Sequence, residues 1–196
     1  CITASHNPPE YNGYKVYWSC GGQLVPPHDK NIIDEYNSIN DYSQFSPVAY
    51  QQGLQDKTIV EVGEDLDDSY FSSIKALVVN PQLPRTIRVG YTPLHGSGIM
   101  AVPRALQEFG FENVWTVKGQ TTPDGNFPTV SSPNPEDPEA LELAIDQAKE
   151  QQADLLLATD PDSDRVSMAL YENSQWVNFN GNQMGSLLCE YILSTL

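Results

Sequence analysis

Basic residues and cysteines are both scarce in this chain of 196 residues, and each scarcity excludes a class of protein. Only 10 Lys and Arg stand against 26 Asp and Glu, and the net charge of −16 repels nucleic-acid phosphates and anionic membrane surfaces. We therefore expect neither nucleic acid nor a membrane as a partner. The cysteines Cys1, Cys20 and Cys189 are odd in number and lack C-x-x-C spacing, which favours reduced thiols in a cytoplasmic protein over a disulfide framework.

Long apolar runs are missing as well. No segment approaches the roughly 18 consecutive apolar residues of a membrane span, and no charged-then-apolar leader indicates secretion. The length suits one large domain or two of about 100 residues each. The chain begins at Cys1 instead of Met, and no cap, Gly or Pro closes its last helical pattern, so we expect a sequence that is cut at both ends.

The first 84 residues give a weak pattern. Residues 14–18 follow an Asn-Gly turn signal and predict a strand, which Gly21 and Gly22 would turn into a hairpin with residues 23–25. Apolar residues at helical spacing predict a helix over residues 32–39, and a second short helix is expected at about residues 67–78. Residues 40–66 look polar and irregular. Two prolines, at positions 81 and 84, indicate a domain boundary.

From residue 85 the pattern becomes alternating strands and helices. We expect strands at residues 87–91, 113–117, 155–158 and 166–171, with helices at about 102–109, 137–148 and from 184 onward. A loop rich in Pro, Gly and Ser at residues 119–136 is long enough to be functional. The alternation predicts an α/β fold with helices flanking a sheet.

An acidic motif follows the most apolar strand. Residues 155–158 are continuously apolar, as in a buried parallel strand, and Asp160 stands at the carboxyl end, where open α/β sheets bind ligands. Asp160, Asp162 and Asp164 would lie about 7 Å apart per step in a straight strand, so only a curled loop could bring them to one ion. Oxygen ligands favour Mg²⁺ or Ca²⁺ over zinc.

Two other interpretations of the acidic motif compete with a metal site. A calcium EF-hand loop needs Gly at its sixth and Glu at its twelfth position, where this chain has Arg165 and Tyr171, so that reading fails. An acidic surface turn is the ordinary alternative. Three aspartates closed by an arginine directly after a buried strand favour the metal.

A serine motif near the start offers a nucleophile. Ser5 precedes His6, a possible base, although the same residues commonly cap a turn before two prolines. A G-x-S-x-G elbow is absent, which argues against a serine hydrolase. A different class, a dinucleotide-dependent dehydrogenase, is suggested by residues 96–101, which fit G-x-G-x-x-A, but such a glycine pattern alone is weak.

Both motifs resemble loops of one enzyme family. Thr3-Ala4-Ser5-His6-Asn7-Pro8 is similar to the active-site serine loop of the α-D-phosphohexomutases, and Asp160-Pro161-Asp162-Ser163-Asp164-Arg165 is similar to their metal-binding loop. Residues 12–17, 92–96 and 181–185 look most like the phosphoglucomutase and phosphopentomutase branch. The resemblance covers essentially the whole chain.

The resemblance implies roles for individual residues. Ser5 would carry a phosphoryl group, and its phosphate would bind Mg²⁺ together with three carboxylates. Asp164 and Arg165 would contact the phosphoserine or the substrate. The remaining assignments are listed by role: the metal ligands Ser5, Asp160, Asp162 and Asp164, and the candidates for proton transfer His6 and Lys15.

The implied activity is that of a phosphoglucomutase. Glucose 1-phosphate and glucose 6-phosphate would interconvert through phosphoserine and glucose 1,6-bisphosphate, with pentose or mannose phosphate as alternative substrates. The oligomeric state is not indicated. A non-catalytic metal-binding fragment is the alternative from another class.

The family also implies four domains. Residues 1–84 would form the later part of the first, residues 85–177 the second, and residues 178–196 the start of the third. This gives two consecutive α/β domains with mixed, mostly parallel sheets flanked by helices, the first one incomplete. The loops that recognise the sugar and its distal phosphate would lie outside this sequence, so we expect the chain alone to bind metal but to turn over substrate poorly.

Overall fold

A computed structural model describes residues 1–195 of the chain. The chain divides into two compact units that we describe separately: Cys1 with residues 14–73, and residues 2–13 with the chain from Ile74 onward. The serine motif therefore belongs to the same unit as the acidic motif. The assignment of residues 1–84, 85–177 and 178–196 to three domains stays a prediction.

The first unit is helical. It holds α1 (His28–Ser38), a short 3₁₀ turn (Tyr42–Gln44), α2 (Tyr50–Asp56) and most of α3 (Glu64–Lys75). The expected hairpin is reduced to one antiparallel bridge between Tyr17 and Gln23. The turn was predicted correctly but its strands were not, because within residues 14–73 no further strand lies beside the pair to extend it.

Helix α2 corrects the expectation that residues 40–66 are irregular. It is short and mostly polar, so its sequence carries little helical periodicity. The buried Gly53 fixes it in place, because a Cβ there would lie 2.5 Å from the Ile59 side chain. Close packing of a glycine against an isoleucine leaves no pattern in the sequence.

The second unit contains a five-stranded mixed sheet in the order β2-β1-β3-β4-β5. The strands are β1 (Val89–Thr92), β2 (Val114–Thr116), β3 (Leu155–Thr159), β4 (Val166–Glu172) and β5 (Gln175–Phe179). Strand β1 pairs in parallel with β2 and β3, whereas β4 runs antiparallel to both β3 and β5. These pairings confirm the α/β class.

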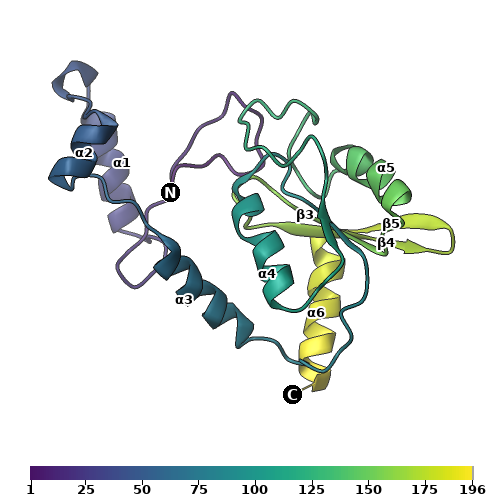
Figure 1. The fold of residues 1–196 in the computed structure, drawn as a ribbon. Coiled ribbons are helices and arrows are strands. Elements are labelled where there is room, and N and C mark those ends of the chain that lie inside the picture. The colour runs from purple at the N-terminus through teal and green to yellow at the C-terminus, as the bar shows by residue number, and fades with distance from the viewer. Residues whose placement is uncertain (196) are drawn as a thin grey trace. The chain divides into compact units, whose positions relative to one another are not determined.

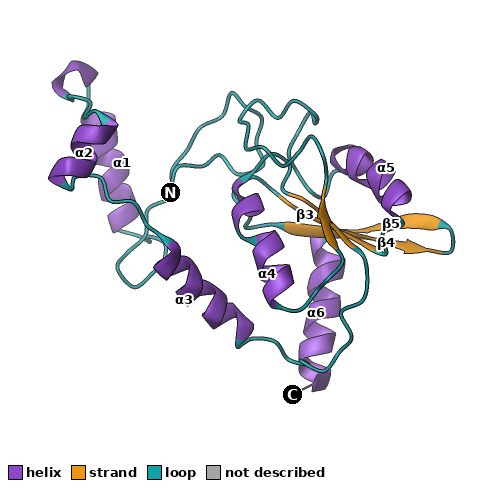
Figure 2. Cartoon of the chain, in the orientation of Figure 1, coloured by secondary structure: helices purple, strands orange, loops and turns teal. Residues whose placement is uncertain are grey.

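Helices cover both faces of this sheet. Figure 1 shows α5 on one face, with α4 and α6 on the other, and Figure 2 sets these helices apart from the strands and the long loops between them. Their bounds are α4 (Val102–Glu108), α5 (Glu142–Gln151) and α6 (Gly181–Thr195), with short 3₁₀ turns at Ser97–Met100 and Pro138–Leu141. Asp137 caps the second of these turns, and its side chain accepts from the Glu139 N–H at 3.2 Å.

The core lies between α5 and the sheet. Ala144 and Ala148 of α5 are fully buried, and their small side chains let the helix approach the Leu156 side chain of β3 closely. Burying such apolar surface stabilises the unit by about 25 cal/mol per Å². Within residues 1–195, no helix combines the length and the apolarity needed to cross a bilayer.

Strand β5 was not predicted. The sequence expectation ended the last strand at residue 171, but β4 turns through Asn173 and Ser174 into a hairpin partner. Both turn residues have positive φ, 50° and 65°, the geometry of a two-residue type I′ turn. An Asn-Ser pair is a weaker signal than Asn-Gly, which explains why the hairpin was missed.

Strands β1 and β3 end side by side, with Thr92 paired to Ala158. Because they are parallel, the loops after both strands emerge at one edge of the sheet. Strand β1 has β2 on one side and β3 on the other, so the chain order reverses between β1 and β3. The carboxyl ends of these two strands therefore form a topological switch point, where α/β sheets bind ligands. The acidic motif begins there.

Candidate active site

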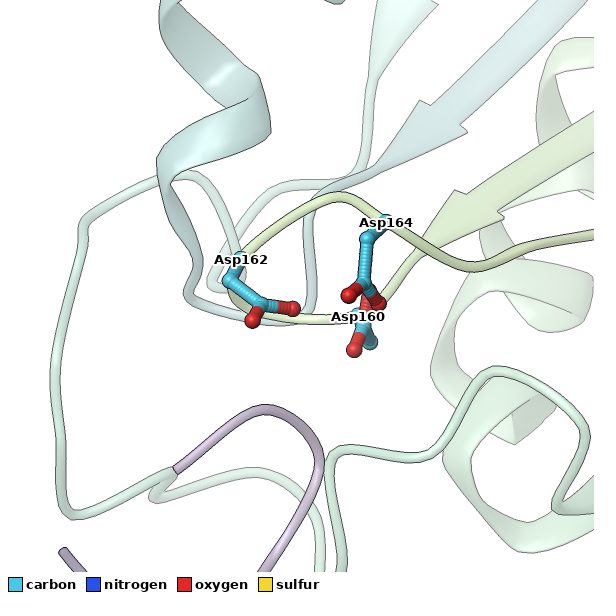
Figure 3. Close-up of side chains that lie close together, drawn as sticks. All are labelled: Asp160, Asp162 and Asp164. Carbon is cyan, nitrogen blue, oxygen red and sulfur yellow. The ribbon is translucent and has the colours of Figure 1, made fainter. Parts of the chain in front are cut away.

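The acidic loop curls directly after β3. Ser163 has φ of 62°, and its N–H donates to the Asp160 carbonyl at 3.0 Å, which bends the chain back on itself. One carboxylate oxygen from each of Asp160, Asp162 and Asp164 lies within 4.8 Å of the others. Figure 3 shows the three side chains turned to the same side of the loop. The curl expected from the sequence is therefore present.

The three carboxylates differ in burial. Asp160 is fully buried, Asp162 half-buried and Asp164 exposed. Burial raises the pKa of Asp160, the nearby Asp162 raises that pKa further, and hydrogen bonds from Arg165 and Ser5 oppose the shift. A divalent cation would relieve this cost, because it replaces lost solvation and offsets the repulsion between carboxylates. The all-oxygen donor set fits Mg²⁺ or Ca²⁺.

Both oxygens of Asp160 have partners. Oδ1 accepts from the Arg165 backbone N–H at 3.0 Å, and Oδ2 accepts from Ser5 Oγ at 2.8 Å. The first bond closes the acidic loop on itself. The second joins it to a serine that lies 155 residues earlier in the sequence.

The serine loop holds Ser5 in an unusual backbone conformation. Its φ of 54° is in the left-handed region, which costs a non-glycine residue on the order of 1–3 kcal/mol. Thr3 supports it, because the Thr3 Oγ1 accepts from the Ser5 N–H at 2.9 Å and donates to Asp162 Oδ2 at 2.9 Å. The left-handed turn thus presents the Ser5 hydroxyl to Asp160.

His6 also contacts the serine. Its Nδ1 lies 3.2 Å from Ser5 Oγ, within hydrogen-bond reach. Because that hydroxyl donates to Asp160, the protonated Nδ1 tautomer of His6 can donate to Oγ in turn. His6 is placed to hold or deliver a proton at this atom.

The two candidate cations, Arg165 and Lys15, belong to different compact units of the chain. The Arg165 side chain borders a cavity of about 380 Å³, which Asp164, Glu136 and the first turns of α6 also line. Lys15 belongs to the first compact unit, so its part in proton transfer stays a prediction.

Sequence patterns assigned no role in the site to Thr3 or to the turn after β1. Thr3 stands in the serine motif, but only the structure shows its hydroxyl joining the two loops. The glycines at positions 96 and 98, read as a weak dinucleotide fingerprint, lie against the acidic loop instead. The only sequence signal for this contact was the pair of glycines after a strand, and such a pair occurs in more than one fold.

Two family descriptions match the chain. Residues 68–173 match phosphoglucomutase/phosphomannomutase alpha/beta/alpha domain II, and residues 1–43 match domain I of the same family. The chain belongs to the phosphoglucomutase/phosphomannomutase family. The two domains fall in the order expected from the serine and acidic motifs.

Individual relatives agree with this membership. The chain is 38% identical over 194 residues to a phosphoglucomutase of Staphylococcus haemolyticus, with 98% of this chain and 35% of the relative covered. It is 36% identical to a probable phosphoribomutase of Schizosaccharomyces pombe (97% and 33% covered) and 38% identical to the glucose 1,6-bisphosphate synthase of Mus musculus (95% and 30%). The chain thus spans about a third of the length of these relatives.

A solved structure supports the fold. The crystal structure of a Thermus thermophilus protein assigned as a phosphomannomutase has a TM-score of 0.73 to this chain, at 24% identity, covering 98% of this chain and 40% of that one. At this identity the likeness concerns the fold alone. It agrees with the α/β class.

Proposed function

We propose that the protein is a phosphosugar mutase that interconverts glucose 1-phosphate and glucose 6-phosphate through a phosphoserine at Ser5. The observation that carries this proposal is the 2.8 Å contact between Ser5 Oγ and Asp160 Oδ2. It places a hydroxyl beside a buried carboxylate of a cluster that can hold a divalent cation. Family membership supports the reaction class.

Asp160, Asp162 and Asp164 are the residues that would hold Mg²⁺, together with an oxygen of phosphorylated Ser5. When bound, Mg²⁺ supplies positive charge to the transferring phosphoryl group, where most catalysis of this reaction class arises. The phosphoserine brings about −2 to a site that already carries three carboxylates. Arg165 and Lys15 are the cations proposed to offset the charge that Mg²⁺ leaves.

Transfer at Ser5 is proposed to run in two steps. In the first, the bond from phosphorus to Ser5 Oγ breaks as a sugar hydroxyl oxygen bonds to phosphorus, and the sugar proton passes to a base. The product, glucose 1,6-bisphosphate, turns around in the site. In the second, Ser5 Oγ takes the other phosphoryl group, and the released sugar oxygen regains a proton.

Two contacts suit Ser5 for this exchange. The carboxylate of Asp160 orients the free hydroxyl by accepting its proton in a hydrogen bond, and His6 Nδ1 at 3.2 Å can donate to the same oxygen. We assign His6 to proton transfer at Oγ, and Lys15 remains the other candidate for proton transfer. Pentose or mannose phosphates are the alternative substrates, and the names of the relatives include more than one sugar.

Labelling of Ser5 tests the proposal. The whole protein is incubated with isotopically labelled glucose 1,6-bisphosphate and digested, and the labelled peptide is located by mass spectrometry. We expect label on Ser5, and mutase activity on glucose 1-phosphate that needs Mg²⁺ and exceeds that on ribose 1-phosphate. Ser5→Ala should reduce activity by about 1,000-fold or more, because the covalent intermediate is lost.

Ser131→Ala is the matched control, since Ser131 is an exposed serine of the same unit. It should label and react as the unchanged protein does. Label on a peptide without Ser5, or full activity of Ser5→Ala, would refute the proposal. Higher activity on ribose 1-phosphate would keep the mechanism and change the sugar.

A further inference from the structure

The turn that follows β1 lies directly against the acidic loop. Ser97 donates twice to the Pro161 carbonyl, from its backbone N–H at 2.8 Å and from Oγ at 2.9 Å. Pro161 stands between Asp160 and Asp162. The two hydrogen bonds therefore fix the backbone between two of the proposed metal ligands.

The glycines on either side of Ser97 are required by space. A Cβ on Gly96 would lie 2.3 Å from Pro161 Cα and 2.6 Å from its carbonyl oxygen, and neither atom can move without moving the acidic loop. Gly96 and Gly98 do not have positive φ, so backbone conformation is not the reason for glycine. Their role is to let two backbones touch.

Gly98 approaches a cluster of three hydroxyls. A Cβ there would lie 2.2 Å from Tyr91 Oη, 2.5 Å from Ser163 Oγ and 2.8 Å from Thr159 Oγ1. Tyr91 Oη and Thr159 Oγ1 are themselves hydrogen-bonded at 2.8 Å in the buried interior. Thr159 immediately precedes Asp160, and Ser163 immediately precedes Asp164, so this cluster touches the loop at both of its ends.

The turn thus contacts the neighbours of all three acids: Thr159 before Asp160, Pro161 before Asp162 and Ser163 before Asp164. We propose that Gly96, Ser97 and Gly98 form the positioning element of the acidic loop, setting the spacing of its carboxylates and so its preference for Mg²⁺ over Ca²⁺. This inference rests on the proposed metal-binding role of the aspartates. It explains Gly96 and Gly98 by their close packing against the acidic loop, without a bound dinucleotide.

The preference follows from the sizes of the two ions. Mg²⁺ requires near-ideal octahedral geometry at about 2.0–2.1 Å, whereas Ca²⁺ accepts irregular shells at about 2.3–2.6 Å. A loop that is pushed open loses the fit for Mg²⁺ first. Disturbing the turn should therefore lower Mg²⁺ affinity more than Ca²⁺ affinity.

Competition against Mn²⁺ measures both affinities without any catalytic assay. Free Mn²⁺ is followed by electron paramagnetic resonance in the whole protein while Mg²⁺ or Ca²⁺ is added. We expect Gly98→Ala and Gly96→Ala to weaken Mg²⁺ binding by about 10- to 100-fold, the usual cost of losing support behind metal ligands, and Ca²⁺ binding by several-fold less. Ser97→Ala, which keeps the backbone bond, should show the same bias at a few-fold.

Gly125→Ala is the matched control, because a Cβ at Gly125 would meet nothing within 4 Å. It should leave both affinities unchanged. Thermal unfolding in EDTA shows whether each variant is folded, and if the two glycine variants are not, Ser97→Ala decides. Folded variants with an unchanged ratio of Mg²⁺ to Ca²⁺ affinity would overturn this inference alone, whereas an unchanged protein that binds no divalent ion would overturn the proposed function with it.

Discussion

Strand β3 has an aspartate at each end, and the two lie in opposite surroundings. Asp154, just before the strand, is 44% exposed and pairs with Arg88, whose Nη2 lies 3.1 Å from Oδ1. Asp160, just after the strand, is fully buried. Hydrogen bonds from Arg88 lower the pKa of Asp154, whereas burial raises the pKa of Asp160.

The protein neutralises the aspartate charge with its own groups at one end of β3 but not at the other. At the amino end of β3, Arg88 also donates its backbone N–H to the Asp154 carboxylate at 2.8 Å. Arg88 therefore supplies both the hydrogen bonds and the positive charge that this carboxylate needs. At the carboxyl end, Asp160 adds its charge to those of two further aspartates. An arrangement of this kind is stable with a cation from outside.

Backbone strain shows the same contrast. Near Asp160, the left-handed residues Ser5 and Ser163 shape the two loops that present chemical groups. Near Asp154, the left-handed Gln152 ends α5, a common way to cap a helix. The left-handed residues at the carboxyl end of β3 thus shape the candidate site, whereas the one at the amino end only terminates a helix.

Replacing each of the two aspartates by asparagine should have its largest effect on metal affinity, and the effect should differ between the two ends of β3. Asp160→Asn removes a unit charge that, at about 4 Å, interacts with each unit of cation charge by on the order of 4 kcal/mol at an effective dielectric of 20. We expect Mn²⁺ affinity to fall by about 100-fold or more, while Asp154→Asn leaves it within about twofold. Equal losses in both variants, measured by the Mn²⁺ assay above, would show that the contrast between the two ends has no bearing on metal.

Asp160→Asn and Asp154→Asn should change the stability of the metal-free protein in opposite directions. The pKa of Asp160 is raised in the folded state, so its charged form is penalised, and stability falls as pH rises from the ordinary value of 3.8 through the raised one. Asp160→Asn should therefore increase the free energy of unfolding at pH 7. The gain should vanish below the ordinary pKa.

Asp154 has the reverse sign. Its pKa is lowered, so its contribution is present above 3.8 and is lost as pH falls through the lower folded value. Asp154→Asn should decrease stability at pH 7 by less than about 1 kcal/mol, since the pair is exposed and screened. Urea unfolding in EDTA at pH 7 and pH 3 measures both variants, and a loss of stability in Asp160→Asn at pH 7 would contradict the assigned cause.

Only the carboxyl-end half of this contrast could be predicted from the sequence, because no pattern singled out Asp154 or Arg88. The apolar run at residues 155–158 indicated a buried parallel strand with Asp160 at its carboxyl end. In the structure β3 is parallel to β1 and Asp160 follows it, but β4 is antiparallel to β3, and Leu155 and Leu157 are only half-buried. Burial on both faces erases polar alternation, which is why such strands are easy to recognise. The acids at alternate positions also indicated a curled loop.

Other parts had no local signal. Nothing in the sequence around Ser5 marks its left-handed conformation, which depends on the Thr3 hydroxyl and on acids far along the chain. The glycines at 96 and 98 are dictated by contacts with Pro161 and its neighbours, and sequence spacing does not encode such contacts. Tertiary packing decided these features, so the family resemblance was needed to join the two loops.

The smallest effect should come from the Arg88–Asp154 pair itself. A double-mutant cycle with Arg88→Ala and Asp154→Asn isolates the side-chain contact, because Asn can still accept from the Arg88 backbone N–H. We expect a coupling of about 0.2–1 kcal/mol at low salt that declines in about 1 M salt, as for other exposed pairs. A coupling above about 2 kcal/mol, or one that salt leaves unchanged, would mean that the amino end of β3 depends on buried charge as its carboxyl end does, and the contrast drawn between Asp154 and Asp160 would fail.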